Sequence, residues 1–164
     1  MASTRFSNTH GIAGLTVDGD WSSGFDSDSV DMSKYNHCTM LIIGDSSVAG
    51  NAVLKVWGGA THGAKTGAAT FTYRYASGNV GSASSDVFGT PTTSAALTST
   101  ATSMDSRVTI IEFDTEDLNV SGTQYRYATL EVGTDGSGGT CDIVAILSEP
   151  RYIEQVMDTA IPTT

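Results

Sequence analysis

Residues 107–113 (RVTIIEF), 125–132 (YRYATLEV) and 140–147 (TCDIVAIL) decide the fold. In each stretch the apolar side chains either recur at every second position or form a short run rich in β-branched residues, which is the period of a strand and not of a helix. Residues 133–139 (GTDGSGG) separate the last two stretches and favour a turn. We therefore predict three strands here, the last two joined as a hairpin.

The first half of the chain carries the same signals. Four further strands are predicted: CTMLIIG at 38–44, AVLKVWG at 52–58, TFTYRY at 70–75 and the weaker SAALTSTA at 94–101. With almost no helical periodicity, the sequence predicts an all-β chain of about seven or eight strands. Its fold class is then an antiparallel β-sandwich, or a jelly-roll-like single domain with extended N- and C-terminal arms.

The predicted sandwich occupies residues 36–149, and the flanking segments are predicted as arms. Residues 1–35 form an N-terminal arm and irregular lead-in, with an edge strand in Ile12–Val17 and a helical turn within residues 26–35 as options. Residues 150–164 form a C-terminal arm, or alternatively a short helix that folds back. Apolar side chains on arms are best buried in an interface. The predicted contact residues are Trp21, Phe25, Tyr152, Ile153 and Met157.

The charge balance restricts the partners. Eight Lys and Arg residues stand against 18 Asp and Glu residues, which gives a formal net charge of −10 with neutral histidines. Such a chain offers no basic stripe for phosphates, so we expect no nucleic-acid partner. An anionic membrane surface would repel it, so we expect no membrane partner either.

Two cysteines, Cys38 and Cys141, lie inside apolar runs. The sequence favours two buried free thiols, with a cross-strand disulfide as the alternative. Residues 1–6 lack the basic and apolar regions of a signal peptide, and no apolar run in the sequence is long enough to span a bilayer. We expect the protein to be made and folded in a reducing cytoplasm.

The residue types that carry catalysis form no recognisable constellation. His37 stands beside Cys38, and neighbouring residues of a strand point to opposite faces, so the two should not share a metal. Carboxylates gather at residues 18–31 and 114–117, where solvated turns are favoured over weak calcium sites. We predict no enzyme activity, no cofactor and no metal. Exposed aromatic side chains could instead stack on sugars. The candidates are Trp21, Trp57, Tyr73, Tyr75, Tyr125 and Tyr127.

The order of the strand sequences resembles a known family. The segments that carry the likeness are VDMSKYNHCTMLIIG at 30–44, NAVLKVWGG at 51–59, RVTIIEFDTEDL at 107–118, YRYATLEV at 125–132 and CDIVAILSEPRY at 141–152. They resemble small structural proteins of tailed bacteriophages that decorate or cement the head. YRY before the penultimate strand and PRY after the last strand are the sharpest points, whereas residues 56–85 depart from the family pattern.

This resemblance implies a capsid decoration protein that binds the outer surface of the phage head and stabilises it by contact. The implied partners are the major capsid protein and further copies of this chain, arranged as a homotrimer. The implied location is the virion, after synthesis in the host cytoplasm. Two alternatives stay open: a tail, neck or fibre-base structural protein, and a carbohydrate-binding β-sandwich module.

Overall fold

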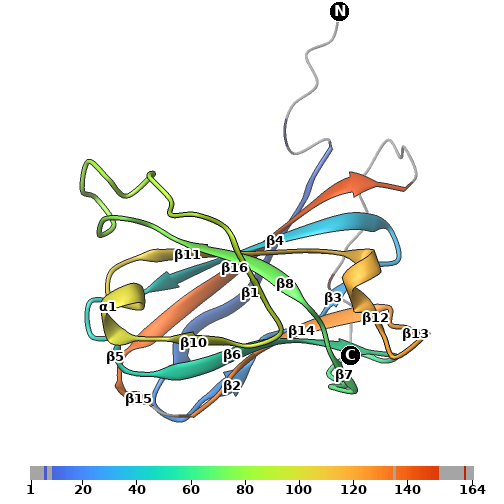
Figure 1. Cartoon of the computed structure of the whole chain (residues 1–164), viewed down its shortest axis with the longest axis horizontal. Helices are drawn as coiled ribbons and strands as arrows, with labels where there is room; N and C mark the ends of the chain where they lie inside the picture. The colour runs from blue at the N-terminus through green and yellow to red at the C-terminus, as the bar shows by residue number, and fades with distance from the viewer. Residues whose placement is uncertain (1–5, 7–8, 135, 152–160, 162–164) are drawn as a thin grey trace, which may run out of the picture.

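The computed structural model describes Phe6, residues 9–134, residues 136–151 and Ile161. In these residues two antiparallel sheets pack face to face around one hydrophobic core (Figure 1). The predicted all-β class and sandwich architecture are therefore confirmed. The finer jelly-roll topology stays a prediction.

The larger sheet has six strands in the order β1-β16-β4-β11-β8-β9. Its strands are β1 (Gly11–Asp20), β16 (Thr140–Pro150), β4 (Tyr35–Gly44), β11 (Val108–Asp114), β8 (Phe71–Tyr75) and β9 (Thr92–Ser94). The predicted strands at 38–44, 70–75, 107–113 and 140–147 all lie in this sheet, so its long central strands are the segments with the strongest apolar signal.

The smaller sheet has the order β10-β6-β14-β2. Its strands are β10 (Leu97–Ser99), β6 (Ala52–Gly59), β14 (Tyr127–Val132) and β2 (Phe25–Asp26), with β3 (Val30–Asp31) beside β14 and β7 (Gly67–Ala68) beside β6. Two short ribbons complete the fold: β12 (Asn119–Val120) with β13 (Thr123–Gln124), and β15 (Gly136–Gly138) with β5 (Ala49–Gly50). The helical segments are α1 (Ala101–Met104) and a 3-10 turn, Thr115–Leu118.

The core lies between the sheets and is built from the alternating positions of each strand. The buried sets are Cys141, Ile143, Ala145 and Leu147 on β16, Ala128, Leu130 and Val132 on β14, and Ala52, Leu54 and Val56 on β6. These are the faces that the period-2 pattern predicts. On β8, Tyr73 packs on the core and meets Tyr75 edge to face, with ring centroids 5.6 Å apart.

The predicted hairpin between 125–132 and 140–147 is wrong. β14 pairs with β6, β2 and β3, whereas β16 pairs with β1 and β4, so residues 133–139 cross from one sheet to the other. One glycine of this connection permits a close approach of the backbone to the sandwich. Gly139 has a φ of +96°, and a Cβ there would lie 2.4 Å from the Cα of Val48. The connection therefore packs on the sandwich instead of making a tight turn.

The prediction that residues 1–35 form an arm is also wrong for Gly11 onwards. Ile12–Val17 lies in an edge strand, β1, which pairs with β16. Register shifts between Gly14 and Thr16 and between Thr16 and Gly19 interrupt the alternation, which explains why the segment looks irregular in sequence. The helical turn that the sequence offers as an option for residues 26–35 is not formed, and β2, β3 and a turn before β4 occupy these residues. The weak strand at 94–101 shortens to Leu97–Ser99 and is followed by α1.

Candidate functional site: the outer face of the large sheet

Seven aliphatic side chains occupy the outer face of the large sheet. They are Ile12, Leu41, Ile43, Val108, Ile110, Val144 and Ile146, which we call the aliphatic band. They face outward because the intervening residues of the same strands, such as Met40 and Ile42, are fully buried in the core. The members are half-buried except Ile12, which is 59% exposed.

The strand register makes the band continuous. Leu41 on β4 stands opposite Val144 on β16 and Ile110 on β11. One row further, Ile43 stands opposite Val108, and at the other side Ile12 of β1 stands opposite Ile146. Directly opposed side chains in antiparallel strands are in contact. The band therefore runs across four strands, from the edge strand β1 to β11.

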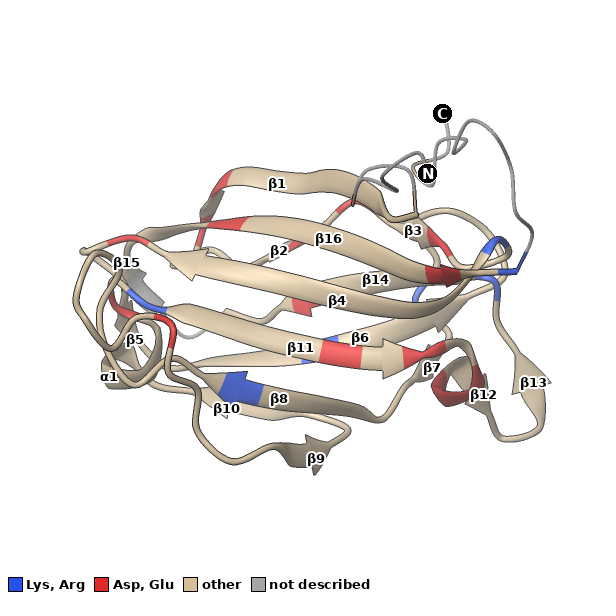
Figure 2. Cartoon of the chain, turned by 90° about the horizontal axis from the view of Figure 1, so that it is seen from above, with Lys and Arg blue, Asp and Glu red and all other residues tan. Residues whose placement is uncertain are grey.

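Charged residues border the band on β8 and β11, and acidic residues lie toward the ends of β1 and β16 (Figure 2). On one side of the band, Arg74 pairs with Glu112 at 2.8 Å, between Nη2 and Oε2. His37 lies next to them, with its Nδ1 2.7 Å from Oδ1 of Asp114 and its Nε2 3.9 Å from Oε1 of Glu112. An apolar centre with a polar rim is the usual anatomy of a protein–protein interface.

The outer face of the small sheet has a different character. Lys65 donates hydrogen bonds to Asp26 (2.9 Å) and Glu131 (2.7 Å), and these bonds raise the pKa of Lys65. The indole Nε1 of Trp57 donates to Glu131 at 2.7 Å, and the Lys55 ammonium lies 5.6 Å from the centre of the Trp57 ring. This part of the face is therefore occupied by an internal network of charges around the Trp57 ring.

The structure separates the six aromatic residues that are candidates for stacking on sugars. Trp21 is in the core, Tyr73, Tyr75 and Tyr125 pack against the core, and only Trp57 and Tyr127 lie together on neighbouring strands of the small sheet. Both of these half-buried rings already lie beside cations, Lys55 at Trp57 and Arg126 at Tyr127. No row of free aromatic faces is formed by these six residues.

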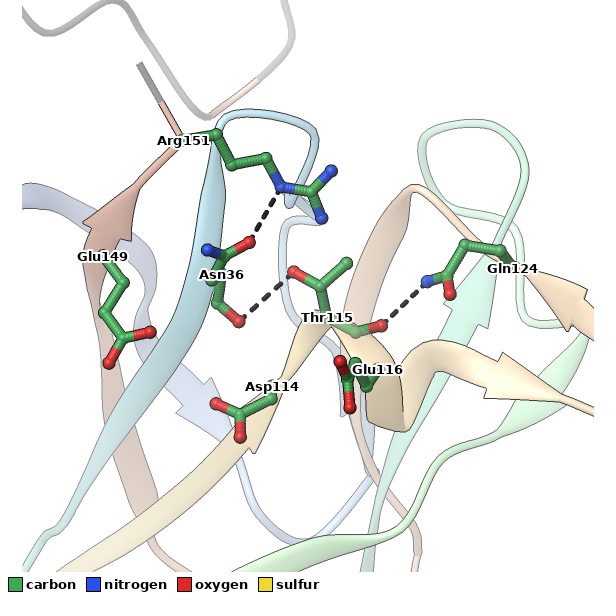
Figure 3. A pocket seen from close by; sticks show the side chains of 7 residues that line it. All are labelled: Asn36, Asp114, Thr115, Glu116, Gln124, Glu149 and Arg151. Atoms are coloured by element: carbon green, nitrogen blue, oxygen red, sulfur yellow. Dashed lines mark hydrogen bonds between the residues drawn. The ribbon is translucent and has the colours of Figure 1, made fainter. Parts of the chain in front are cut away.

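A polar cavity of about 470 Å³ lies at the end of the sandwich where β4, β11 and β16 meet the 3-10 turn (Figure 3). It is lined by Asn36, Asp114, Thr115, Glu116, Gln124, Glu149 and Arg151. Thr115 donates through its hydroxyl to the backbone oxygen of Tyr35 at 2.9 Å, and Gln124 donates to the backbone oxygen of Thr115 at 2.8 Å. Arg151 donates from Nε to Oδ1 of Asn36 at 2.9 Å. These bonds tie Arg151, directly after β16, to β4, and they tie β4 and β13 to the turn.

Three carboxylates of this cavity, Asp114, Glu116 and Glu149, give it an acidic lining (Figure 3). It contains no cysteine or histidine among its lining residues. Over the described part of the chain, no three His, Cys, Asp or Glu side chains are placed to hold a metal ion together. In the same residues, no helix is long and apolar enough to cross a membrane.

The structure separates the predicted contact residues. Trp21 is 0% exposed inside the domain, so the prediction that its side chain contacts a partner is wrong. Phe25 is partly buried and packs against the core. Tyr152, Ile153 and Met157 lie outside the described residues. Ile161, the described residue of the predicted C-terminal arm, is partly buried against the core.

The two cysteines are buried free thiols, as predicted. Cys38 stands opposite Leu147, whereas Cys141 stands opposite Gly44, six positions further along β4. That offset is about 20 Å along a strand, far beyond the reach of a disulfide. Burial raises the pKa of both thiols, that of Cys141 to about 12.

The sequence carries a signal for the aliphatic band, but that signal is also typical of strands that are buried on both faces. In residues 38–44 and 140–147 the apolar residues do not alternate with polar ones but continue on both faces. Such runs are typical of strands covered on both sides. Here the inner face is covered by the small sheet, and the outer face keeps the same apolar character at the surface.

No family model, no curated protein and no solved structure matches this chain.

Proposed function

We propose that this protein is a structural component of a tailed-bacteriophage virion, a decoration protein that binds the outside of the head. The observation that carries the proposal is the aliphatic band on the outer face of the large sheet. Contiguous apolar patches on soluble proteins mark contact sites, and burying them provides the main favourable term of association. The family resemblance supplies the identity of the partner, the major capsid protein.

The charge of the chain agrees with a place on the outer surface. A net charge of −10 disfavours contact with packaged DNA and keeps many closely spaced copies soluble. A protein that binds the assembled shell but not the free subunits stabilises the shell by mass action. The resemblance further implies contacts between copies of this chain, in a homotrimer.

The first test is the number of copies in purified particles, measured by quantitative mass spectrometry against the major capsid protein. A decoration protein should be present at about one copy per capsid subunit, or one per few. A few copies per particle would instead place it in the tail, neck or fibre base. Absence from the particles would refute a virion role altogether.

The second test is the binding surface. Val144→Glu places a carboxylate in the middle of the band, and burying it unpaired against a partner should weaken binding to heads at least about tenfold. Val53→Glu is the matched control, because Val53 is 37% exposed on β6, on the outer face of the small sheet. Equal binding by both variants, each folded by circular dichroism, would contradict docking through the band.

A further inference from the structure

Four charged or titratable side chains border the aliphatic band on one side. They are His37 on β4, Glu112 and Asp114 on β11, and Arg74 on β8, which we call the charged rim. The rim adjoins the band directly, because Glu112 occupies the outward position after Ile110 on β11, and Arg74 stands opposite Ile110. A partner that covers the band therefore also removes water from the rim.

The net charge of the rim depends on the protonation of His37. Arg74 and Glu112 pair at 2.8 Å, so their charges cancel. Among the described residues, His37 is the ion-pair partner of Asp114, with Nδ1 2.7 Å from Oδ1. A neutral imidazole leaves the rim with one unbalanced negative charge, whereas an imidazolium makes it neutral. In the free chain Asp114 is 62% exposed, so water solvates its carboxylate in either state.

The surroundings of His37 contain more carboxylates than cations. The charged groups on the elements beside it are Glu112 and Asp114 on β11, Glu116 and Asp117 in the 3-10 turn, Glu149 on β16, Arg151 directly after β16, and Arg74 on β8. Nε2 of His37 lies 3.9 Å from Oε1 of Glu112 and 3.2 Å from the hydroxyl of Thr39. Figure 3 shows Asp114 and Glu149 on the two sides of β4. These neighbours favour a charged imidazolium once water is removed.

We propose that the band docks on an apolar partner surface that carries no cation for Asp114, and that His37 takes up a proton when this contact forms. Burying an unpaired carboxylate is costly, and a charged His37 removes that cost through a charge-assisted hydrogen bond. Because the protonated rim is neutral within this chain, the partner has no charge to supply. The inference rests on the proposed docking through the band and specifies the partner surface.

The proton gives attachment a defined dependence on pH. The complex holds the His37 proton more tightly than the free chain does, so the stabilisation is complete at low pH and is lost as the pH rises. Histidine changes its charge near neutral pH, within the range in which proteins stay folded. Where His37 is neutral in the free chain and charged in the complex, the dissociation constant should rise about tenfold per pH unit.

Co-sedimentation of the full chain with purified heads, between about pH 6 and pH 8, measures this dependence. We expect the wild-type chain to bind at least about tenfold more tightly at the lower pH. His37→Gln is neutral throughout and should bind weakly at every pH. His37→Arg is charged throughout and should bind tightly at every pH. Asp114→Asn removes the carboxylate and should strengthen binding at the higher pH.

His62→Gln is the matched control, because His62 lies in the loop before β7 with Nε2 3.8 Å from Oδ1 of Asp28. Its side chain is 30% exposed, close to the 26% of His37, and its substitution should leave the pH profile unchanged. Titration calorimetry in two buffers of different ionisation enthalpy should count about one proton taken up per bound copy. Thermal unfolding of each variant confirms that it folds.

The outcomes separate this inference from the proposed function. Binding to heads that does not change with pH would overturn proton uptake and leave the proposed function standing. A pH dependence that persists in His37→Gln, or a His37→Arg variant as weak as His37→Gln, would overturn the role of His37 in the same way. A chain that binds heads at no pH would refute the proposed function and this inference with it.

Discussion

Replacing Trp21 by alanine tests whether the N-terminal third belongs to the sandwich. Trp21 directly follows β1, is 0% exposed, and is the largest of the fully buried side chains. Its backbone N–H donates to the backbone oxygen of Gly139 at 3.0 Å, which ties this segment to the connection between the sheets. If the segment were a loosely attached arm, the substitution would leave the stability of the domain nearly unchanged.

The expected loss of stability on Trp21→Ala follows from the burial of the Trp21 side chain. Removing a fully buried tryptophan typically costs about 3–5 kcal/mol, a large part of the roughly 5–15 kcal/mol by which a domain is stable. The expected loss is reduced because the Trp21 indole Nε1 is buried without a hydrogen-bond partner among the described residues. An unsatisfied buried N–H costs about 1–3 kcal/mol. Trp21→Phe removes that cost together with part of the ring, so we expect it to lose no more than about 2 kcal/mol.

Urea unfolding, monitored by far-UV circular dichroism, measures the loss in the free energy of unfolding for Trp21→Ala and for Trp21→Phe. Val17→Ala is the control, because Val17 is 78% exposed and its substitution should change the free energy of unfolding by no more than about 0.5 kcal/mol. A loss below about 1 kcal/mol for Trp21→Ala would refute the placement of Trp21 in the core. A Trp21→Phe variant as unstable as Trp21→Ala would show instead that the indole N–H is satisfied.

Three further predictions concern single sites. Gly44→Ala puts a methyl group 2.0 Å from a backbone oxygen at the end of α1, so we expect destabilisation of about 2 kcal/mol or more by urea unfolding. Burial raises the pKa of Asp31, but hydrogen bonds from Arg126 and Ser33 outweigh it and lower that pKa overall. The stabilisation from the Asp31 carboxylate is complete above its unfolded pKa of about 3.9 and is lost as the pH falls below that value. Arg126→Ala should therefore reduce the fall in melting temperature that the protein shows at acidic pH, measured over a pH series. The two thiols should resist maleimide in the folded protein and react only on unfolding, because both are buried with raised pKa values; rapid labelling of the native chain would contradict their burial.

The inward faces of the strands could be predicted because alternation is a local property. Leu54 and Val56 on β6 and Leu130 on β14 are buried where the period-2 pattern puts them. The pairing of the strands is not local. The glycine-rich residues 133–139 between two strands predict a hairpin, yet β14 lies between β6 and β2 while β16 lies between β1 and β4. Which strand is a neighbour depends on the whole sheet, and no turn signal contains that information.

The candidate site was predictable only in part. The Gly- and Ser-rich surroundings of Trp21 resemble a tail and so predict an interface residue, because the bulges of β1 break the alternation that would reveal a strand. The aliphatic band was visible as apolar residues on both faces of the central strands, such as Leu41 and Ile43 next to Ile42. Sequence does not specify which faces the chain itself covers, and this distinction separates a core strand from a docking surface.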